Sequence, residues 1–338
     1  MITQQHFIGI DVSKKWLDVF VRTTKKHFQT SNDQQGYGWM IRRIEGESIS
    51  VKEAFFCFEN TGMYSIMLSR FMSANSYAFL LAHPLDVKLS GGATRGKNDK
   101  IDAIRLADYA YRKREELKPS KASSQSTDRL RILFAVRQQL VKNRAALIAT
   151  EGEYTSVLSL KLNDPIIEIQ TAVIAELTKQ ISRLNDEIAS TIQADSDLRH
   201  NYKRLLSIPG IGPVVATAML MYTDNFTKFT TARKFCSYCG MTPYDHQSGS
   251  SIKRKPKTSR LANKEMKSLI DRGALSIIEH DADMKAYFDR KTAEGKEKRV
   301  VINAVRCKIV YRAFKVIKEQ RMYIKKTTEY QQYLKNAA

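Results

Sequence analysis

Two short apolar runs that each end on a single acid constrain the fold of this chain more than any other feature. Phe7–Ile10 leads directly into Asp11, and Ala54–Phe58 leads directly into Glu59. Apolar runs of this length, bounded by turn residues, are typical of buried strands. Because each acid follows the last apolar residue, we expect each strand to hold one carboxylate at an edge of a sheet.

Further strands and helices are predicted around these two runs. The expected strands are Trp16–Val21, His27–Thr30 and Tyr77–Leu81, and the expected helices are Gln34–Gly46, Met63–Met72 and one from Asp99 to about Glu116. Three strands in succession, followed by alternating helix and strand, indicate a mixed sheet with flanking helices.

Two more acids are predicted to join Asp11 and Glu59. Asp99 and Asp102 are three residues apart at a helix start, so their side chains share one face. Taken singly, each has an ordinary interpretation as a helix cap, a surface acid or a strand-end acid. Four acids in one α/β domain can instead hold two divalent cations about 3.5–4 Å apart, an arrangement that cleaves phosphodiesters. Asp18 and Asp108 are interpreted as residues of solvated faces.

The charge balance favours a polyanionic partner. The chain has 56 Lys and Arg against 35 Asp and Glu, a net charge of +21. Nucleic acid is the commonest partner of so basic a protein, although a generally basic surface is the alternative. Four cysteines are too few for a disulfide scaffold and suggest a reducing cytosol. No signal peptide and no membrane span are expected.

The middle of the chain has a helical seam pattern. After a polar break at Lys118–Thr127, apolar residues recur at spacings of 7, 4, 4, 3, 4 and 4, namely at Ile166, Val173, Leu177, Ile181, Leu184, Ile188 and Ile192. This pattern is typical of a coiled coil or a helical hairpin. The helices would either pair two chains or form a hairpin within one chain.

Two C-terminal stretches are candidates for nucleic-acid contact. Leu206–Pro213 reads as a glycine-rich connection between helices, whose Gly210 and Gly212 let the backbone approach phosphates, unless it is an ordinary bend. Asp245–Ser259 is predicted to be a polar loop. It carries Ser248, a candidate nucleophile. The stretch Gln247–Ser251 is followed by cations that can neutralise a phosphate, namely Lys253, Arg254, Lys255, Lys257 and Arg260. A solvated linker is the alternative. Helices are expected at about Ala262–Glu279 and Arg299–Arg321.

Two further motifs are rejected. Gly91–Asn98 nearly matches a phosphate-binding loop, but Asn98 replaces the hydroxyl residue that binds magnesium. A basic loop in which Lys97 contacts a nucleic-acid backbone explains it better. Cys236 and Cys239 have the spacing of half a zinc site, but no second pair of ligands accompanies them.

Taken together, the motifs resemble a known family. Gly9–Lys14, Glu59–Tyr64 and Lys97–Ala103 look like the three blocks of a DEDD, RuvC-like transposase domain. Ile208–Gly212, and Cys239–Pro243 followed by Gln247–Ser251, resemble the C-terminal domain of the same enzymes. The chain is thus similar to the insertion-sequence transposases of the IS-one-ten type, which are related to the Piv DNA invertase.

The resemblance implies an α/β plus all-α fold. Residues 1–118 would form an RNase H-like (RuvC-like) mixed-sheet domain, residues 119–200 a coiled-coil connector, and residues 201–338 a helical transposase domain with a helix-hairpin-helix-like segment. The enzyme would be a homo-oligomer, a tetramer of paired dimers with sites shared between subunits. It would act in the bacterial cytoplasm, at the nucleoid.

The resemblance also implies a chemistry. Asp11, Glu59, Asp99 and Asp102 would hold Mg²⁺, and Ser248 would attack DNA to form a covalent 5′-phosphoserine intermediate. A structured bridge RNA would pair with both donor and target DNA. The chain departs from the family at Gln247, often Glu, and near Ala262, where a glycine is usual. The rival readings are a Holliday-junction resolvase that uses only the four acids, and a non-catalytic nucleic-acid-binding protein.

Overall fold

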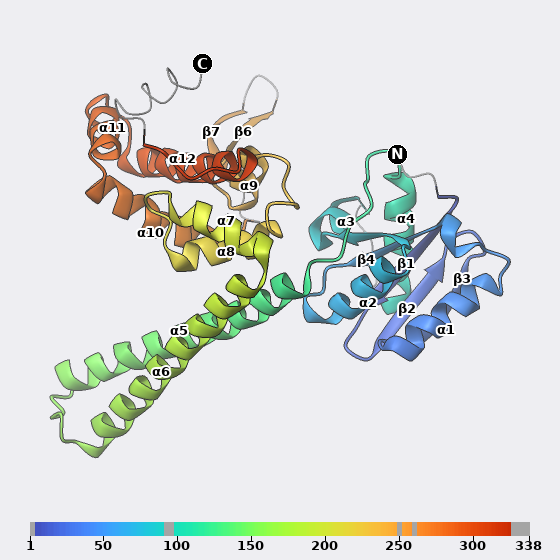
Figure 1. The fold of residues 1–338 in the computed structure, drawn as a ribbon, viewed down its shortest axis with the longest axis horizontal. Coiled ribbons are helices and arrows are strands. Elements are labelled where there is room, and N and C mark those ends of the chain that lie inside the picture. Colours follow the sequence, from blue (N-terminus) through green and yellow to red (C-terminus); the bar gives the residue numbers. More distant parts are fainter. Residues whose placement is uncertain (1–3, 91–97, 249–251, 259–261, 326–338) are drawn as a thin grey trace. The chain divides into compact units, whose positions relative to one another are not determined.

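The chain consists of two compact units, Met1–Ser124 and Gln125–Ala338 (Figure 1). In this computed structural model, residues 4–90, 98–248, 252–258 and 262–325 are described. Each unit is considered by itself below.

The first unit is built on one five-stranded sheet. Its strands are β1 (His6–Val12), β2 (Trp16–Val21), β3 (Lys26–Ser31), β4 (Ala54–Glu59) and β5 (Ala78–Ala82), in the spatial order β3-β2-β1-β4-β5. The first three strands form an antiparallel meander, and β4 and β5 run parallel to β1. The predicted mixed sheet is confirmed, and its strand order is consistent with an RNase H-like fold.

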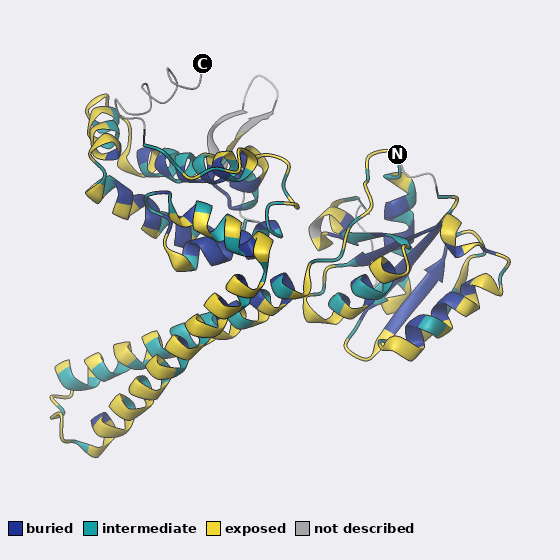
Figure 2. Cartoon of the chain, viewed as in Figure 1, coloured by how far each residue is buried: buried dark blue, intermediate teal, exposed yellow. Residues whose placement is uncertain are grey.

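Helices cover both faces of the sheet, because successive side chains of a buried strand point to opposite sides. Ile10 and Phe58 pack on one face with α1 (Gln34–Glu45) and α2 (Met63–Ala74). Phe55 and Cys57 pack on the other face, with α3 (Pro84–Ser90) and α4 (Asp99–Arg112). A 3₁₀ turn, Val51–Glu53, leads into β4. Figure 2 shows the strands buried between these layers.

The second unit begins with a helical hairpin made of α5 (Gln125–Ser156) and α6 (Pro165–Ala194). Polar contacts between the two helices include Arg129 with Glu187 at 3.1 Å and Thr171 with Glu151 at 2.5 Å. The hairpin within one chain is therefore observed. Pairing between two chains through the same helices stays a prediction.

The predicted seam of the hairpin is correct only in its second half. Ile181, Ile188 and Ile192 are buried, but Ile166 is 52% exposed and Val173 is 44% exposed. The buried residue at the start of α6 is Ile167, which is 1% exposed. Two apolar stripes with similar spacing run along this helix, and only one of them faces α5.

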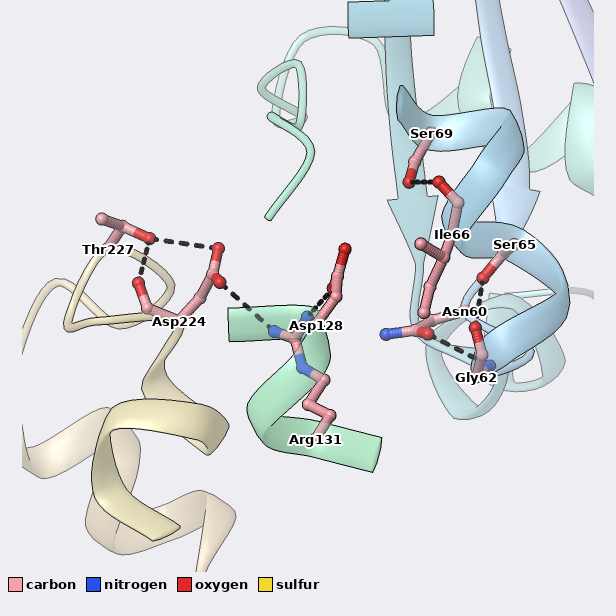
Figure 3. Close-up of polar contacts among 9 residues, drawn as sticks. All are labelled: Asn60, Gly62, Ser65, Ile66, Ser69, Asp128, Arg131, Asp224 and Thr227. Carbon is pink, nitrogen blue, oxygen red and sulfur yellow. Dashed lines mark hydrogen bonds and ion pairs between the residues drawn. The ribbon is translucent and has the colours of Figure 1, made fainter. Parts of the chain in front are cut away.

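The described residues after the hairpin include six shorter helices: α7 (Ser196–Leu206), α8 (Pro213–Thr223), α9 (Ala232–Tyr238), α10 (Lys264–His280), α11 (Ala282–Ala293) and α12 (Lys298–Lys318). The base of the hairpin belongs to their core, since Phe134 and Ile192 are buried with Val305. Arg131 pairs with Asp128 within α5 at 2.6 Å and connects α5 to the turn after α8 through Asp224 at 3.3 Å (Figure 3).

The segment predicted to be a polar loop is instead mostly a β-hairpin. Strands β6 (Pro243–Ser248) and β7 (Ile252–Thr258) pair antiparallel, with a register shift between Tyr244 and His246. The prediction failed because the stretch is polar and rich in lysine, and so lacks the apolar alternation by which a strand is recognised. Helix α11 was also not predicted. None of the described helices is long and apolar enough to cross a membrane.

Candidate active site

Asp11 and Glu59 lie side by side at the carboxyl ends of two parallel strands. Gly9 pairs with Cys57 and Ile10 with Phe58, so the next residues along the two strands are Asp11 and Glu59. Because the side-chain period of a strand is two, both acids project from the face that carries Gly9 and Cys57. This is the face covered by α4.

Gly9 allows α4 to lie directly on the sheet. A Cβ at this position would stand 1.9 Å from the backbone oxygen of Ala103 and 2.5 Å from the amide nitrogen of Ala107. The first turn of α4 is thereby carried towards the end of β1. Asp99 and Asp102 both lie in that turn. Asn98, rather than Asp99, caps the helix, and its side chain accepts from the Ile101 amide at 3.2 Å.

The other acids lie close enough to Asp11 to affect its ionisation. Burial, together with the negative charges of Asp102, Asp99, Glu59 and Asp18, raises the pKa of Asp11 to about 6. A carboxyl group surrounded by like charges is stabilised by any cation that binds among them. The structure thus brings the four predicted acids into one electrostatic cluster.

A glycine turn directs the chain away after Glu59. Gly62 has φ of +69° and precedes the first residue of α2. Its amide donates to the side chain of Asn60 at 3.3 Å, and its carbonyl accepts from Ser65 at 3.2 Å (Figure 3). Since a positive φ suits glycine, this turn is specified by the sequence. It sets the start of α2 immediately beyond the acid.

The interpretation of Asp18 as a solvated residue is wrong. Asp18 is 7% exposed and lies directly opposite Asp11 in the β1–β2 pairing, so the two carboxylates share a face. Its oxygens contact His27 at 2.9 Å and the Gln29 amide at 3.1 Å. Only the strand register reveals this fifth acid. Asp108, by contrast, forms a part-exposed ion pair with Arg22 at 2.9 Å.

The acids fit a hard divalent cation by their chemistry, since carboxylate oxygens are the ligands that Mg²⁺ prefers. In the described part of the chain, no three acidic, histidine or cysteine side chains are yet close enough to enclose one ion. Asp102 is paired with Arg105 at 2.7 Å. A cation would therefore require the carboxylates to turn inward, with Asp102 exchanging Arg105 for the metal.

Ser248 is the last residue of β6 and pairs with Ile252 across the tip of the β-hairpin. The backbone of β7 places Lys253 opposite Gln247, Arg254 opposite His246 and Lys257 opposite Tyr244. Lys255 lies on the same strand. The serine and four of the predicted cations therefore belong to one short ribbon. Gly249–Ser251, Arg260 and Lys97 lie outside the described residues.

The glycine-rich connection between α7 and α8 has a packing role that the sequence did not show. Gly210 has φ of +85°, and a Cβ there would stand 2.7 Å from the carbonyl oxygen of Gly273 in α10. A Cβ on Gly273 would in turn meet the oxygen of Gly210 at 2.2 Å. Gly210 is thus explained by helix packing. A Cβ on Gly212 would meet nothing within 4 Å, and this residue directly precedes the first amides of α8.

Cys236 and Cys239 belong to the core. They are 2% and 0% exposed, and burial raises the pKa of the Cys239 thiol. These are the properties of structural cysteines rather than of metal ligands or redox thiols.

Two family models match the chain. One, described as a transposase and representing the DEDD transposases of IS110 elements, matches residues 8–150, which contain the four acids. The other, described as the transposase IS116/IS110/IS902 family, matches residues 202–289, which contain Ser248.

Similar proteins extend the match over the connector. The pilin gene-inverting protein of Moraxella bovis is 27% identical, and the alignment covers 96% of this chain and 99% of that protein. A putative transposase of Sinorhizobium fredii is 27% identical over 76% of this chain and 71% of its own length. An uncharacterized 42 kDa protein of insertion element IS900 from Mycobacterium paratuberculosis is 24% identical over 69% and 74%.

Proposed function

Because this chain belongs to the IS110/IS116 family of insertion-sequence transposases, we propose that it recombines DNA by a metal-assisted serine attack guided by a bridge RNA. In this proposal residues 1–118 are the RuvC-like catalytic domain, residues 119–200 the connector, and residues 201–338 the domain that carries the nucleophile. The similarity to a gene-inverting protein supports a reaction that breaks and rejoins strands.

The observation that carries the chemistry is the clustering of acids around Asp11. Four carboxylates that interact electrostatically, with the pKa of Asp11 raised to about 6, form a set that a divalent cation would neutralise. Asp11, Glu59, Asp99 and Asp102 would hold Mg²⁺, which would stabilise charge on the scissile phosphate. Arg105, which pairs with Asp102 at 2.7 Å, would add positive charge beside the same phosphate.

Ser248 is proposed as the nucleophile. Its hydroxyl oxygen bonds to phosphorus and releases its proton, while the bond to the 3′ oxygen of the DNA breaks and that oxygen takes up a proton. The product is a 5′-phosphoserine ester and a free 3′ hydroxyl. Attack by another 3′ hydroxyl reverses the exchange and joins new strands, so no outside energy source is needed. Lys253, Arg254, Lys255, Lys257 and Arg260 would neutralise the DNA backbone nearby, and Lys97, Gly210 and Gly212 are further proposed contacts.

A covalent adduct tests this mechanism. Wild-type protein incubated with donor DNA and Mg²⁺ should yield a denaturant-resistant protein–DNA species, and Ser248→Ala should abolish it. Ser250→Ala and Ser251→Ala should weaken it less. If only Ser251→Ala removed the adduct, Ser251 rather than Ser248 would be the nucleophile. Metal-dependent cutting that leaves free ends, with no adduct in the wild type, would favour the resolvase alternative.

RNA guidance is tested separately. A net charge of +21 supports tight and salt-sensitive RNA binding, because each neutralised phosphate releases counterions. Purification at moderate salt should recover a discrete RNA encoded beside the gene, with segments complementary to donor and target. Recovery of heterogeneous RNA only, together with recombination that needs no RNA, would contradict the guide.

A further inference from the structure

The first unit has a groove on the opposite side of its sheet from the acids. It lies between the edge strand β3 and the first turns of α1, and has a volume of about 510 Å³. Its lining includes Ser31, Gln34, Gln35, Gly38, Trp39 and Arg42. We name it the α1 groove. Helix α1 packs on the face of the sheet opposite to the one that carries the acids, so the α1 groove is a separate site (Figure 1).

Trp39 is a partly exposed aromatic platform in this groove. It is 42% exposed, although the chain has only two tryptophans and a large core that can bury them. Its ring lies nearly perpendicular to that of Phe28, with centroids 5.5 Å apart and planes at 77°. An indole that is fixed by an aromatic contact and still partly exposed is suited to stacking on another flat ring.

Gly38 leaves the helix backbone beside Trp39 uncovered by a side chain, although no neighbouring group requires a glycine there. A Cβ at Gly38 would meet only the Arg42 guanidinium, at 3.7 Å, which is an ordinary contact. Gly36 differs, since a Cβ there would stand 2.0 Å from the Ser31 oxygen. Glycine inside a helix lowers its stability relative to alanine. Gly38 is therefore best explained by a ligand that approaches the backbone closely.

The chemistry of the groove indicates which ligand that is. Gln35, Gly38, Trp39 and Arg42 follow the spacing of one helix face, so stacking, close-approach and cationic groups are adjacent. No acidic side chain is among the described residues that line the groove. Exposed glutamine amides both donate and accept hydrogen bonds, as base edges require. These side chains would complement a ligand with a flat ring, polar edges and one negative charge, which are the properties of a nucleotide.

We propose that the α1 groove binds an unpaired nucleotide of a single-stranded nucleic-acid segment, with its base on Trp39 and its phosphate at Arg42. A base within a duplex is stacked on its neighbours on both sides, so the ligand must be unpaired. The inference rests on the proposed function only in supposing a nucleic-acid partner. It is independent of the acids and of Ser248.

Tryptophan fluorescence tests the site directly. In Trp16→Phe, Trp39 is the only remaining tryptophan. Protein freed of nucleic acid at high salt should show quenching on titration with oligo-U or oligo-dT, and little quenching with a duplex of the same length. Tighter binding of oligo-U identifies RNA as the source of the nucleotide, and tighter binding of oligo-dT identifies DNA. Equal quenching by the duplex, or none by any oligonucleotide, overturns the proposal.

Two substitutions separate binding from folding. Gly38→Ala in the same background should raise the melting temperature but weaken single-strand binding about tenfold, the scale of one lost stacking contact. Gly152→Ala in α5 is the matched control, since its methyl group would meet nothing within 4 Å. It should leave single-strand binding unchanged. Trp39→Ala, followed by a labelled oligonucleotide, should lose affinity to a similar extent.

Unchanged affinity in both Gly38→Ala and Trp39→Ala would overturn the site. This failure is distinct from failure of the proposed function. A Ser248-dependent adduct without Trp39 quenching would refute only the groove, whereas quenching without an adduct would refute only the serine mechanism.

Discussion

The negative charge of Asp11 opposes folding of the metal-free protein. Its pKa rises from 3.8 to about 6 in the folded protein, so ionisation is less favourable there than in the unfolded chain. The penalty is absent below the ordinary pKa, grows between about pH 4 and pH 6, and is fully present at pH 7. Acid sites that bind metals commonly sacrifice stability in this way.

Asp11→Asn should therefore stabilise the metal-free protein while abolishing recombination. Because the carboxyl is partly exposed, solvent screening reduces the expected gain to about 1 kcal/mol. Thermal unfolding in EDTA at pH 7 should show a melting temperature a few degrees higher. Added Mg²⁺ should stabilise the wild type and not the variant.

Asp108→Asn is the control for this experiment, because it removes the same charge from the same unit. Asp108 pairs with Arg22 at 2.9 Å on a part-exposed surface, so its loss should change stability little or slightly lower it. Full recombination by Asp11→Asn in Mg²⁺ would show that the metal assignment is wrong.

The residues of this site differ in how far the sequence alone could identify them. Asp11 and Glu59 could be predicted because an acid that directly follows a buried strand lies at an edge of the sheet. Asp18 was misjudged because its burial depends on pairing with β1 and on contacts with His27 and Gln29 from the next strand. Nothing local in Trp16–Val21 reports these cross-strand partners.

At the scale of elements, the contact of α4 with β1 determines the geometry of the acids. Gly9→Val should force the helix away, because the new side chain would overlap the Ala103 carbonyl, which is already 1.9 Å from an ideal Cβ. Overpacking of this kind costs about 1–3 kcal/mol. Since Asp99 and Asp102 move with α4, Mg²⁺-dependent stabilisation should also fall.

Gly46→Ala in the same unit is the control for Gly9→Val. Its methyl group would meet nothing closer than 3.4 Å, so stability and Mg²⁺ response should be retained. Mg²⁺ titrations followed by thermal unfolding measure both variants. A Gly9→Val protein with an unchanged Mg²⁺ response would show that the position of α4 does not set the acid cluster.

The hairpin offers a neighbouring pair of residues that tests its register. Ile167→Ala should destabilise the second unit by about 2 kcal/mol or more, because a buried isoleucine loses its contacts. Ile166→Ala should change stability by less than about 0.5 kcal/mol, since that side chain is 52% exposed. Urea unfolding measures both. A larger loss of stability in Ile166→Ala than in Ile167→Ala would instead support the seam predicted from the sequence.

The errors made at this scale have a common cause. Most helices and strands were predicted from their periodicity within a few residues. The start of the α6 seam was shifted because Ile166 and Ile167 both fit a spacing of three and four, and only contact with α5 distinguishes them. Strands β6 and β7 were missed because Lys253 and its neighbours give no apolar alternation. Pairing partners, rather than local propensity, decide both cases.

At the scale of the whole molecule, the acids and the serine belong to different compact units. A helix of 30 residues is about 45 Å long, but α6 returns along α5, and the base of the hairpin joins one core. The length of the hairpin therefore sets no distance between Asp11 and Ser248.

The hairpin has an exposed apolar patch, and we propose that it contacts another copy of the chain. Exposed residues gather at its far end, namely Val157, Leu158, Leu162, Ile166, Ile169 and Val173. Exposed apolar patches of this kind mark interaction surfaces. A homo-oligomer joined there would place the acids of one subunit and the serine of another in one assembly.

Co-expression of two inactive variants distinguishes a shared site from a site within one chain. Asp11→Asn lacks a functional acid cluster and Ser248→Ala lacks the nucleophile, so each alone should be inactive. If a site takes acids from one subunit and serine from another, about a quarter of the sites in a random mixed oligomer are intact. Recombination and adduct formation should then reappear, with the DNA attached only to the Asp11→Asn chain. Mixed oligomers that recombine no more than either variant alone would place both halves of the site in one chain.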